Sequence, residues 1–419
     1  MDHRADLHFV RVVVITPSLP LPFGKADARW LHVAVTGLSS RGHDVVCLSC
    51  TEDDSEAVHR AADLAQTGGY EFRHIPLSLD PGPVTLRRFN SLRRPFNEYE
   101  RVAGLRKAVD ELAKNADVVH IEHLFTSRIG EGLGNAVTYL HHLEVIDWEE
   151  RTDLDRRTRF VRSQMERATR QILRSTDRAI AATSRLAARA TVINPRIRTA
   201  IVPVSIDPAL YSTPPLPDEP IVGVIGSMHW YPSRSAADRT LTRLWPAIHA
   251  QIPEARLLVA GWGSAEYLGH RFPLRGAELM GEVGSPVDFF GAISTLLYPP
   301  ARGSGFKIKV LEAMAYGRAV VSNQEGLEGL TDRGALVPLL AETDADFIEV
   351  TVELLRDRVL GSSLGVSGRA QVESQYSPEP AIDRLVEAYD RLGLAPSRTR
   401  SPIGVRANKS DANTTGDSK

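Results

Sequence analysis

The apolar residues of this chain fall into short runs, many of them rich in valine and isoleucine, separated by longer stretches that mix apolar and polar positions. Such short runs are typical of strands buried on both faces of a parallel sheet. The alternation predicts an α/β protein built from strand–helix–strand units in doubly wound sheets. The expected strands are 11–16, 45–49, 116–122, 137–140, 178–183 and 201–205, then 221–225, 256–260, 279–283, 293–298 and 319–322.

The alternation is interrupted once, at residues 206–220, which hold five prolines. We interpret this stretch as a linker between two domains, 1–205 and 221–377. An amphipathic helix is expected after them, at 378–395. The last residues, 396–419, are polar and nearly free of large apolar side chains, so they predict a disordered tail.

The most informative stretch runs from Tyr298 to Glu328. A strand ends there in two prolines, Gly303 and Gly305 follow, and a helix is expected from about residue 306 to 316. Lys307 occupies the first turn of that helix, where the helix dipole disfavours cations. Free N–H groups combined with lysines at a helix start are typical of an anion site, most simply for a phosphate.

Glu312 follows Lys309 by three residues, so both side chains are expected on the same face of that helix. A carboxylate one turn beyond a phosphate site is able to accept two hydrogen bonds from a ribose diol. The alternative is a surface Lys–Glu pair on an ordinary helix.

The segment GSGFKIKVLEAMAYGRAVVSNQEGLEGL, residues 303–330, resembles the donor-site segment of GT-B nucleotide-sugar glycosyltransferases of the retaining family 4 type. The resemblance implies two Rossmann-like domains that face each other across a cleft, with the 378–395 helix crossing back to the first. It implies that Glu312 binds the donor ribose and Lys309 the diphosphate. The family often has an acidic residue where this chain has Ser304, so backbone amides of residues 303–305 are expected to contact the donor sugar instead.

A second resemblance covers residues 226–263, which look like the start of the family's donor domain. It implies that backbone at Gly226 and Gly261 approaches the diphosphate. The family often has arginine and lysine in the first of these loops, and here they are absent. The phosphate charge is therefore expected to be met by Lys309, Lys307 or Arg302. The remaining donor-site candidates are Ser227, beside Gly226, and Val283, near the base.

The first half resembles the family more loosely. Its loop after the first strand looks like an acceptor-side loop, in which Gly24 and Lys25 are the candidates. The strand at 116–122 ends near His120 and His123, and the family commonly places a histidine there, beside the transferred sugar. His123 lies further into the loop and is our candidate. A metal fragment is the alternative for this pair, but no third ligand is evident.

Composition excludes several classes of protein. The formal net charge of −2 over 419 residues shows no global signature of nucleic-acid binding. No apolar run approaches a membrane span, and the start shows no signal-peptide pattern, so we expect a cytoplasmic protein. Cys47 and Cys50 are expected to be ordinary reduced thiols. A basic region, with Arg87, Arg88, Arg93, Arg94 and Arg101, is either a solvated helix face or a contact for an anionic acceptor or a membrane surface.

The resemblance therefore implies transfer of a hexose-type sugar from a nucleoside-diphosphate sugar, with UDP or GDP expected, to an acceptor hydroxyl with retention of anomeric configuration. No metal cofactor is expected, since no Asp-x-Asp motif lies in a suitable loop. Small-molecule, lipid-linked and polysaccharide acceptors all remain open. Two alternatives stand beside transfer: a sugar-nucleotide epimerase on the same fold, and a non-catalytic nucleotide-sugar-binding partner of a transferase.

Overall fold

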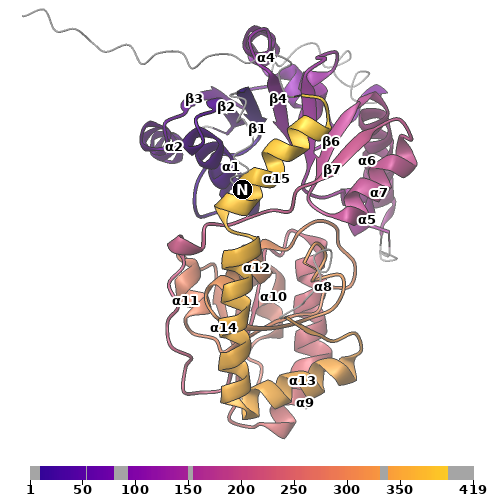
Figure 1. The fold of residues 1–419 in the computed structure, drawn as a ribbon. Helices are drawn as coiled ribbons and strands as arrows, with labels where there is room; N and C mark the ends of the chain where they lie inside the picture. Colours follow the sequence, from indigo (N-terminus) through magenta and orange to yellow (C-terminus); the bar gives the residue numbers. More distant parts are fainter. Residues whose placement is uncertain (1–9, 53, 80–92, 150–153, 331–337, 395–419) are drawn as a thin grey trace, which may run out of the picture.

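The computed structural model describes residues 10–52, 54–79, 93–149, 154–330 and 338–394. Two parallel sheets, each covered by helices, form two domains stacked one above the other (Figure 1). The predicted tail at 396–419, together with Arg87 and Arg88, lies outside the described residues.

The N-terminal domain contains a seven-stranded sheet in the order β3-β2-β1-β4-β5-β6-β7. The first strand, RVVVIT, is buried at five of its six positions, as expected for a central strand with helices on both faces. Its strands are β1 (Arg11–Thr16), β2 (Asp44–Thr51), β3 (Glu71–Pro76), β4 (Val118–Glu122), β5 (Ala136–Leu140), β6 (Arg178–Ala181) and β7 (Arg198–Ile201). Its helices are α1 (Ala26–Ser40), α2 (Ser55–Gly68), α4 (Leu105–Ala113), α5 (Glu144–Asp147), α6 (Arg156–Ser175) and α7 (Ser184–Ile193).

The C-terminal domain contains a six-stranded sheet in the order β10-β9-β8-β11-β12-β13. The chain order reverses between β8 and β11, and such a switch point opens a crevice at the carboxyl ends of the strands. The strands are β8 (Ile221–Ile225), β9 (Arg256–Ala260), β10 (Ala277–Gly281), β11 (Thr295–Tyr298), β12 (Ala319–Ser322) and β13 (Leu339–Leu340). The helices are α8 (Tyr231–Arg239), α9 (Trp245–Gln251), α10 (Ser264–Leu268), α11 (Pro286–Phe290), α12 (Ile308–Ala315), α13 (Asp344–Arg356) and α14 (Arg358–Gln375).

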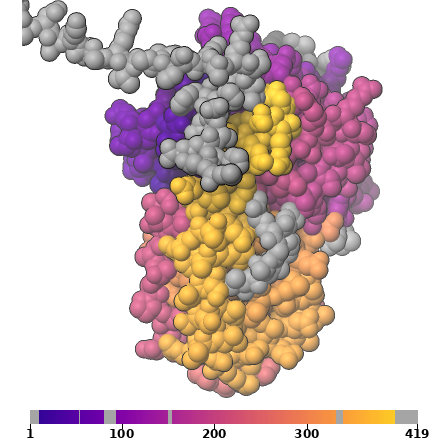
Figure 2. Space-filling model, viewed as in Figure 1, coloured from indigo at the N-terminus to yellow at the C-terminus, as the bar shows by residue number. Residues whose placement is uncertain are grey.

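The last helix, α15 (Pro378–Arg391), packs on α1 of the N-terminal domain. A Cβ at Gly37 of α1 would lie 2.4 Å from the Ile382 side chain, so the absence of a side chain there allows the close packing. Figure 2 shows this C-terminal stretch, in yellow, extending from the lower domain onto the upper one. The two domains are therefore joined by α15 as well as by the segment around residue 210.

Several elements differ from the expectation. Strand β3 was not predicted, because EFRHIP lies at a sheet edge, has no fully buried position and lacks the continuous apolar run of the other strands. The helix expected at 306–316 is shorter and begins at Ile308, so Lys307 is its N-cap residue. The strand expected at 279–283 ends at Gly281, which leaves Val283 in the loop before α11.

Candidate active site

The carboxyl ends of β8, β9 and β11 meet at one point of the C-terminal sheet. A Cβ at Gly226 would lie 2.5 Å from the Lys309 Nζ, and a Cβ at Gly261 would lie 2.1 Å from the Gly226 carbonyl oxygen. Gly261 also has a φ of +122°, which side chains rarely adopt. The structure therefore brings these three predicted residues together, with the Gly226 loop against the Lys309 ammonium group and the Gly261 loop against Gly226.

Lys309 lies in the first turn of α12 and is partly buried. Its Nζ donates a hydrogen bond to the Ser233 Oγ at 2.7 Å and lies 4.4 Å from the centre of the Tyr298 ring. No carboxylate of the described residues lies within ion-pair distance of this ammonium group. Burial, followed by the like charge of Lys307, lowers the pKa of Lys309 to about 7, against the opposing charge of Glu312. A cation held in this way at a helix start is prepared for an anionic ligand.

The other two predicted cations are used within the protein. Lys307 is 2% exposed, donates to the Gly305 carbonyl at 2.5 Å, and lies 3.7 Å from Glu328. Arg302 pairs with Glu149 at 2.8 Å and with Glu325 at 3.0 Å. Of the three cations predicted to meet the charge of the diphosphate, Lys309 alone has no carboxylate partner among the described residues.

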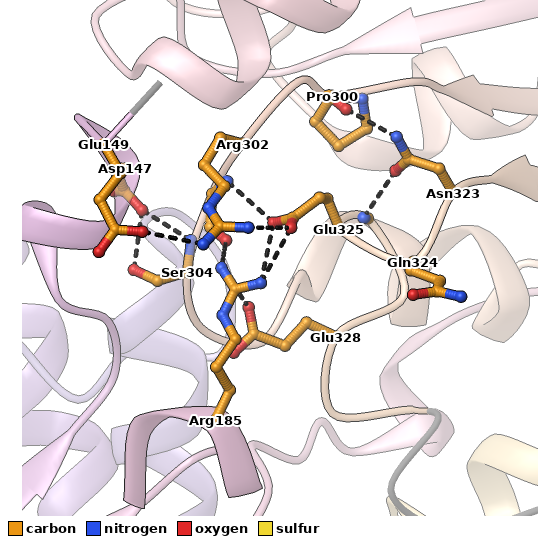
Figure 3. A network of polar contacts seen from close by, with 12 residues as sticks. Asp147, Glu149, Arg185, Pro300, Arg302, Ser304, Asn323, Gln324, Glu325 and Glu328 are labelled. Atoms are coloured by element: carbon orange, nitrogen blue, oxygen red, sulfur yellow. Dashed lines mark hydrogen bonds and ion pairs between the residues drawn. The ribbon is translucent and has the colours of Figure 1, made fainter. Parts of the chain in front are cut away.

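Ser304 and its neighbours face the N-terminal domain rather than an open donor pocket. Asp147, at the end of α5, accepts hydrogen bonds from the Ser304 N–H at 2.6 Å and from the Ser304 hydroxyl at 2.8 Å (Figure 3). Its other oxygen accepts from the Trp230 indole at 2.9 Å. A Cβ at Gly305, where φ is +79°, would lie 2.0 Å from the His141 carbonyl oxygen. The loop before α12 is thus part of the contact between the domains.

Arg185 completes this contact, and no sequence pattern pointed to it. It lies at the start of α7 and pairs with Glu325 at 3.0 Å and with Glu328 at 3.5 Å (Figure 3). It also donates to the carbonyl of Gly303, while the N–H of Gly303 donates to Glu325 at 3.2 Å. The Gly303 amide is therefore engaged within the protein.

Glu312 meets a partner from the other domain. Its Oε2 lies 2.7 Å from the Arg29 guanidinium of α1, and both side chains are nearly buried. Burial raises the pKa of Glu312, although the Arg29 charge opposes this shift. A surface Lys–Glu pair on an ordinary helix is therefore not what the structure shows, because Glu312 is directed into the interface between the domains.

The two histidines after β4 have different surroundings. His120 is 1% exposed and lies between Tyr389 of α15 and Glu122, so it is a core residue. His123 has a φ of +68°, stacks on His141 with ring centres 4.4 Å apart, and contacts Asp27 of α1 at 3.0 Å. Although burial acts in the opposite direction, the hydrogen bond and charge of His123 hold the pKa of Asp27 well below its usual value.

The remaining candidates are less tightly held. Gly24 has a φ of +109°, and a Cβ added there would meet nothing within 4 Å. Lys25, which is exposed, is the N-cap residue of α1. Ser227 accepts a hydrogen bond from the His229 N–H at 3.3 Å. Val283 is half-buried beside α11.

The described residues also bear on metal binding, on the two cysteines and on membrane spans. Within them, no group of three or more His, Cys, Asp or Glu side chains is arranged to hold a metal ion. Cys47 and Cys50 are both free and buried. A helix with the length and apolar character needed to span a membrane was not found over the same residues.

Comparison with known families defines the class of this protein. Residues 219–357 match the family described as Glycosyl transferases group 1, and residues 28–205 match the Glycosyl transferase 4-like domain. Together with the two facing Rossmann-like domains, these matches show that the chain belongs to the GT-B glycosyltransferases. The predicted fold class and the prediction of a glycosyltransferase are confirmed.

The individual relatives share little sequence with this chain. A GDP-mannose-dependent monoacylated alpha-(1-6)-phosphatidylinositol monomannoside mannosyltransferase of Corynebacterium glutamicum is 29% identical over 165 residues. That match covers 35% of this chain and 42% of the mannosyltransferase. Among solved structures, Anabaena HepE in complex with UDP and glucose has a TM-score of 0.65 at 13% identity, covering 91% of this chain and 99% of HepE. WaaG, a glycosyltransferase involved in lipopolysaccharide biosynthesis, has a TM-score of 0.58 at 18% identity, covering 91% of this chain and all of WaaG. These structures share the fold.

Proposed function

We propose that this protein transfers a hexose from a nucleoside-diphosphate sugar to an acceptor hydroxyl, with retention of the anomeric configuration. The observation that carries the proposal is the Lys309 ammonium at the start of α12, pressed against Gly226 and without a carboxylate partner among the described residues. A diphosphate is the ligand whose charge this arrangement complements, at the crevice where ligands of open α/β sheets bind.

The proposed roles of the site residues follow from where charge develops during sugar transfer. As the bond from the sugar to the diphosphate breaks, negative charge grows on the leaving group, and a fixed cation with helix N–H groups stabilises it. We expect no metal requirement, because Lys309 and the helix start meet that charge. His123, held by Asp27 at 3.0 Å, is the residue we place beside the transferred sugar. Closure of the domains through Asp147 and Arg302 excludes water and so limits hydrolysis of the donor.

We expect a UDP- or GDP-sugar as the donor. One relative is named for its dependence on GDP-mannose, and HepE has been solved with UDP-glucose. The acceptor is a small molecule, a lipid-linked sugar or a polysaccharide.

A donor screen tests the proposal. UDP-, GDP-, ADP- and dTDP-sugars are incubated with the protein, with and without EDTA, and released nucleotide and sugar products are measured. Transfer, or slow donor hydrolysis without an acceptor, supports the proposal. Conversion of the donor into an isomer would indicate an epimerase instead, and binding without turnover would indicate a non-catalytic partner.

Donor affinity is expected to depend on pH through Lys309. The pKa of its ammonium group is about 7 in the free protein, and a bound diphosphate raises it. Above pH 7, binding must therefore take up a proton, so affinity falls as the pH rises, by at most about tenfold per pH unit. Below pH 7 the lysine is already charged and affinity levels off.

Isothermal titration with a nucleotide sugar between pH 6 and 9.5 measures this dependence. A nucleotide sugar is used because its diphosphate is esterified at both ends and does not titrate in that range. Lys309→Met is the control, and its weaker affinity should be independent of pH. A pH profile shared by the wild type and Lys309→Met would show that another group titrates.

A further inference from the structure

A groove of about 460 Å³ lies between α6 and α7 of the N-terminal domain. Helices α5, α6 and α7 lie side by side on one flank of that domain (Figure 1). Among the described residues, none of those that line the groove is a candidate for donor binding. Its charged lining consists of four arginines and two glutamates: Arg162, Arg170, Arg174, Arg189, Glu149 and Glu166. The groove is therefore a polar cavity that the proposed function does not use.

The charged row along α6 follows from the spacing of the sequence. Residues 162, 166, 170 and 174 are each four positions apart, so their side chains share one face of the helix. Glu166 lies 3.0 Å from Arg162 and 3.9 Å from Arg170. Arg174 follows Arg170 as a like charge, and like charges at this spacing destabilise a helix. An anion in the groove would remove that repulsion.

The groove contains more positive charge than its carboxylates neutralise. Arg174 has no hydrogen bond or ion pair among the described residues. Glu149 pairs with Arg189, but it also pairs with Arg302 of the C-terminal domain at 2.8 Å. Four arginines therefore face two carboxylates, one of which is shared with a cation outside the groove. The excess of two positive charges matches a phosphate monoester, whose charge is about −1.5 to −2 at pH 7.

A buried hydroxyl at the groove lacks a hydrogen bond. Thr169 lines the groove, its side chain is 0% exposed, and its Oγ1 has no partner among the described residues. Inside a helix, such a hydroxyl often bonds to the carbonyl four residues earlier, and here it does not. Buried polar groups are nearly always hydrogen-bonded, so this exception requires an explanation. A phosphate oxygen in the groove would accept the hydrogen bond that Thr169 lacks.

We propose that the groove between α6 and α7 binds a phosphate monoester, held by Arg170, Arg174, Arg189 and the Thr169 hydroxyl. Guanidinium groups stay charged at every physiological pH and bind phosphate through paired N–H donors. A carboxylate ligand would neutralise only one of the two excess charges. The inference does not depend on the proposed function, because it concerns a separate cavity.

Two sources supply such a group, a soluble phosphorylated molecule and a lipid head group. Isothermal titration with sn-glycerol 3-phosphate tests the first. Sedimentation with phosphatidylcholine vesicles, with and without phosphatidic acid, tests the second, and phosphatidic acid contains the same glycerol phosphate. Binding in solution would identify a soluble ligand, and binding only to vesicles with phosphatidic acid would identify a lipid. Absence of binding to both probes would contradict the inference.

The decisive variant is the double change Arg170→Met with Arg174→Met. Affinity for the probe that binds should fall about 10- to 100-fold, because hydrogen bonds between charged groups are lost. The melting temperature should change little, since Glu166 keeps Arg162 at 3.0 Å. Thr169→Val, which removes only the hydroxyl, should lower affinity about 2- to 10-fold.

The matched control is Arg156→Met with Arg159→Met. It removes two arginines from the same helix, and both are exposed and absent from the described lining of the groove. This control should keep the affinity of the wild type. An equal loss in the control and in the decisive variant would show attraction to the general charge of α6, and the inference would be wrong.

Lys309→Met separates the groove from the proposed diphosphate site, which also attracts phosphate. Binding that is kept in Lys309→Met and lost in the decisive variant supports the inference. Binding that is lost in Lys309→Met and kept in the decisive variant would overturn the inference and leave the proposed function standing.

Discussion

Lys309→Met is expected to lower turnover about 100- to 1,000-fold, the usual effect of removing one group that stabilises developing negative charge. The melting temperature at pH 7.5 should stay constant or rise. The pKa of Lys309 is lowered in the folded protein, to about 7, so the unfolded chain binds the proton more tightly. The charged lysine therefore opposes folding at every pH below its unfolded pKa, and its removal relieves that cost. Steady-state kinetics and a thermal melt check both parts.

Lys307→Met is the matched control, since it removes the same group two residues earlier. Burial lowers the pKa of Lys307 as well, but Lys307 binds the Gly305 carbonyl and lies near Glu328. Its removal leaves both of these buried groups without that partner, so it should mainly lower the melting temperature. If Lys307→Met proved the more damaging change to turnover per folded protein, or if Lys309→Met mainly lowered stability, the roles of the two lysines would be the reverse of those proposed.

Asp147→Ala is expected to lower turnover about 100-fold and to destabilise the protein. The carboxylate accepts hydrogen bonds from the Ser304 N–H, the Ser304 hydroxyl and the Trp230 indole, all from the other domain. Without it, the loop before α12 and the loop before α8 are no longer held together, and displacement of a site by about 1 Å costs roughly that factor. Donors left buried without an acceptor each cost about 1–3 kcal/mol.

Asp155→Ala separates loss of stability from loss of the site. Asp155 is the N-cap of α6, accepts from the Thr158 N–H at 2.7 Å, and lies on a helix of the N-terminal domain. Its removal should cost about 0.5–2 kcal/mol of stability while turnover is retained. Equal turnover in Asp147→Ala and Asp155→Ala, measured well below both melting temperatures, would contradict the role of Asp147.

The candidate site could be proposed from the sequence where it depends on local spacing. Lys309 and Glu312 lie three residues apart on one helix, and the glycines at 226 and 261 directly follow apolar strands. Helical period, strand ends and the resemblance of these segments to the family are all local properties, so these residues became candidates without the fold. Lys307 and Arg302 looked equivalent to Lys309 in the sequence, and only the distances to Glu328 and Glu149 distinguished them.

The sequence by itself determined the alternation of strands and helices, the family, and the helix on which a diphosphate site is proposed. Those features follow from periodicity and from short motifs. The tertiary structure decided the partners: Arg29 for Glu312, Asp147 for Ser304, and Arg185 for Glu325. Each of these pairs joins residues more than a hundred positions apart, in different domains. Their contacts depend on how the two sheets are placed against each other, which no local pattern encodes.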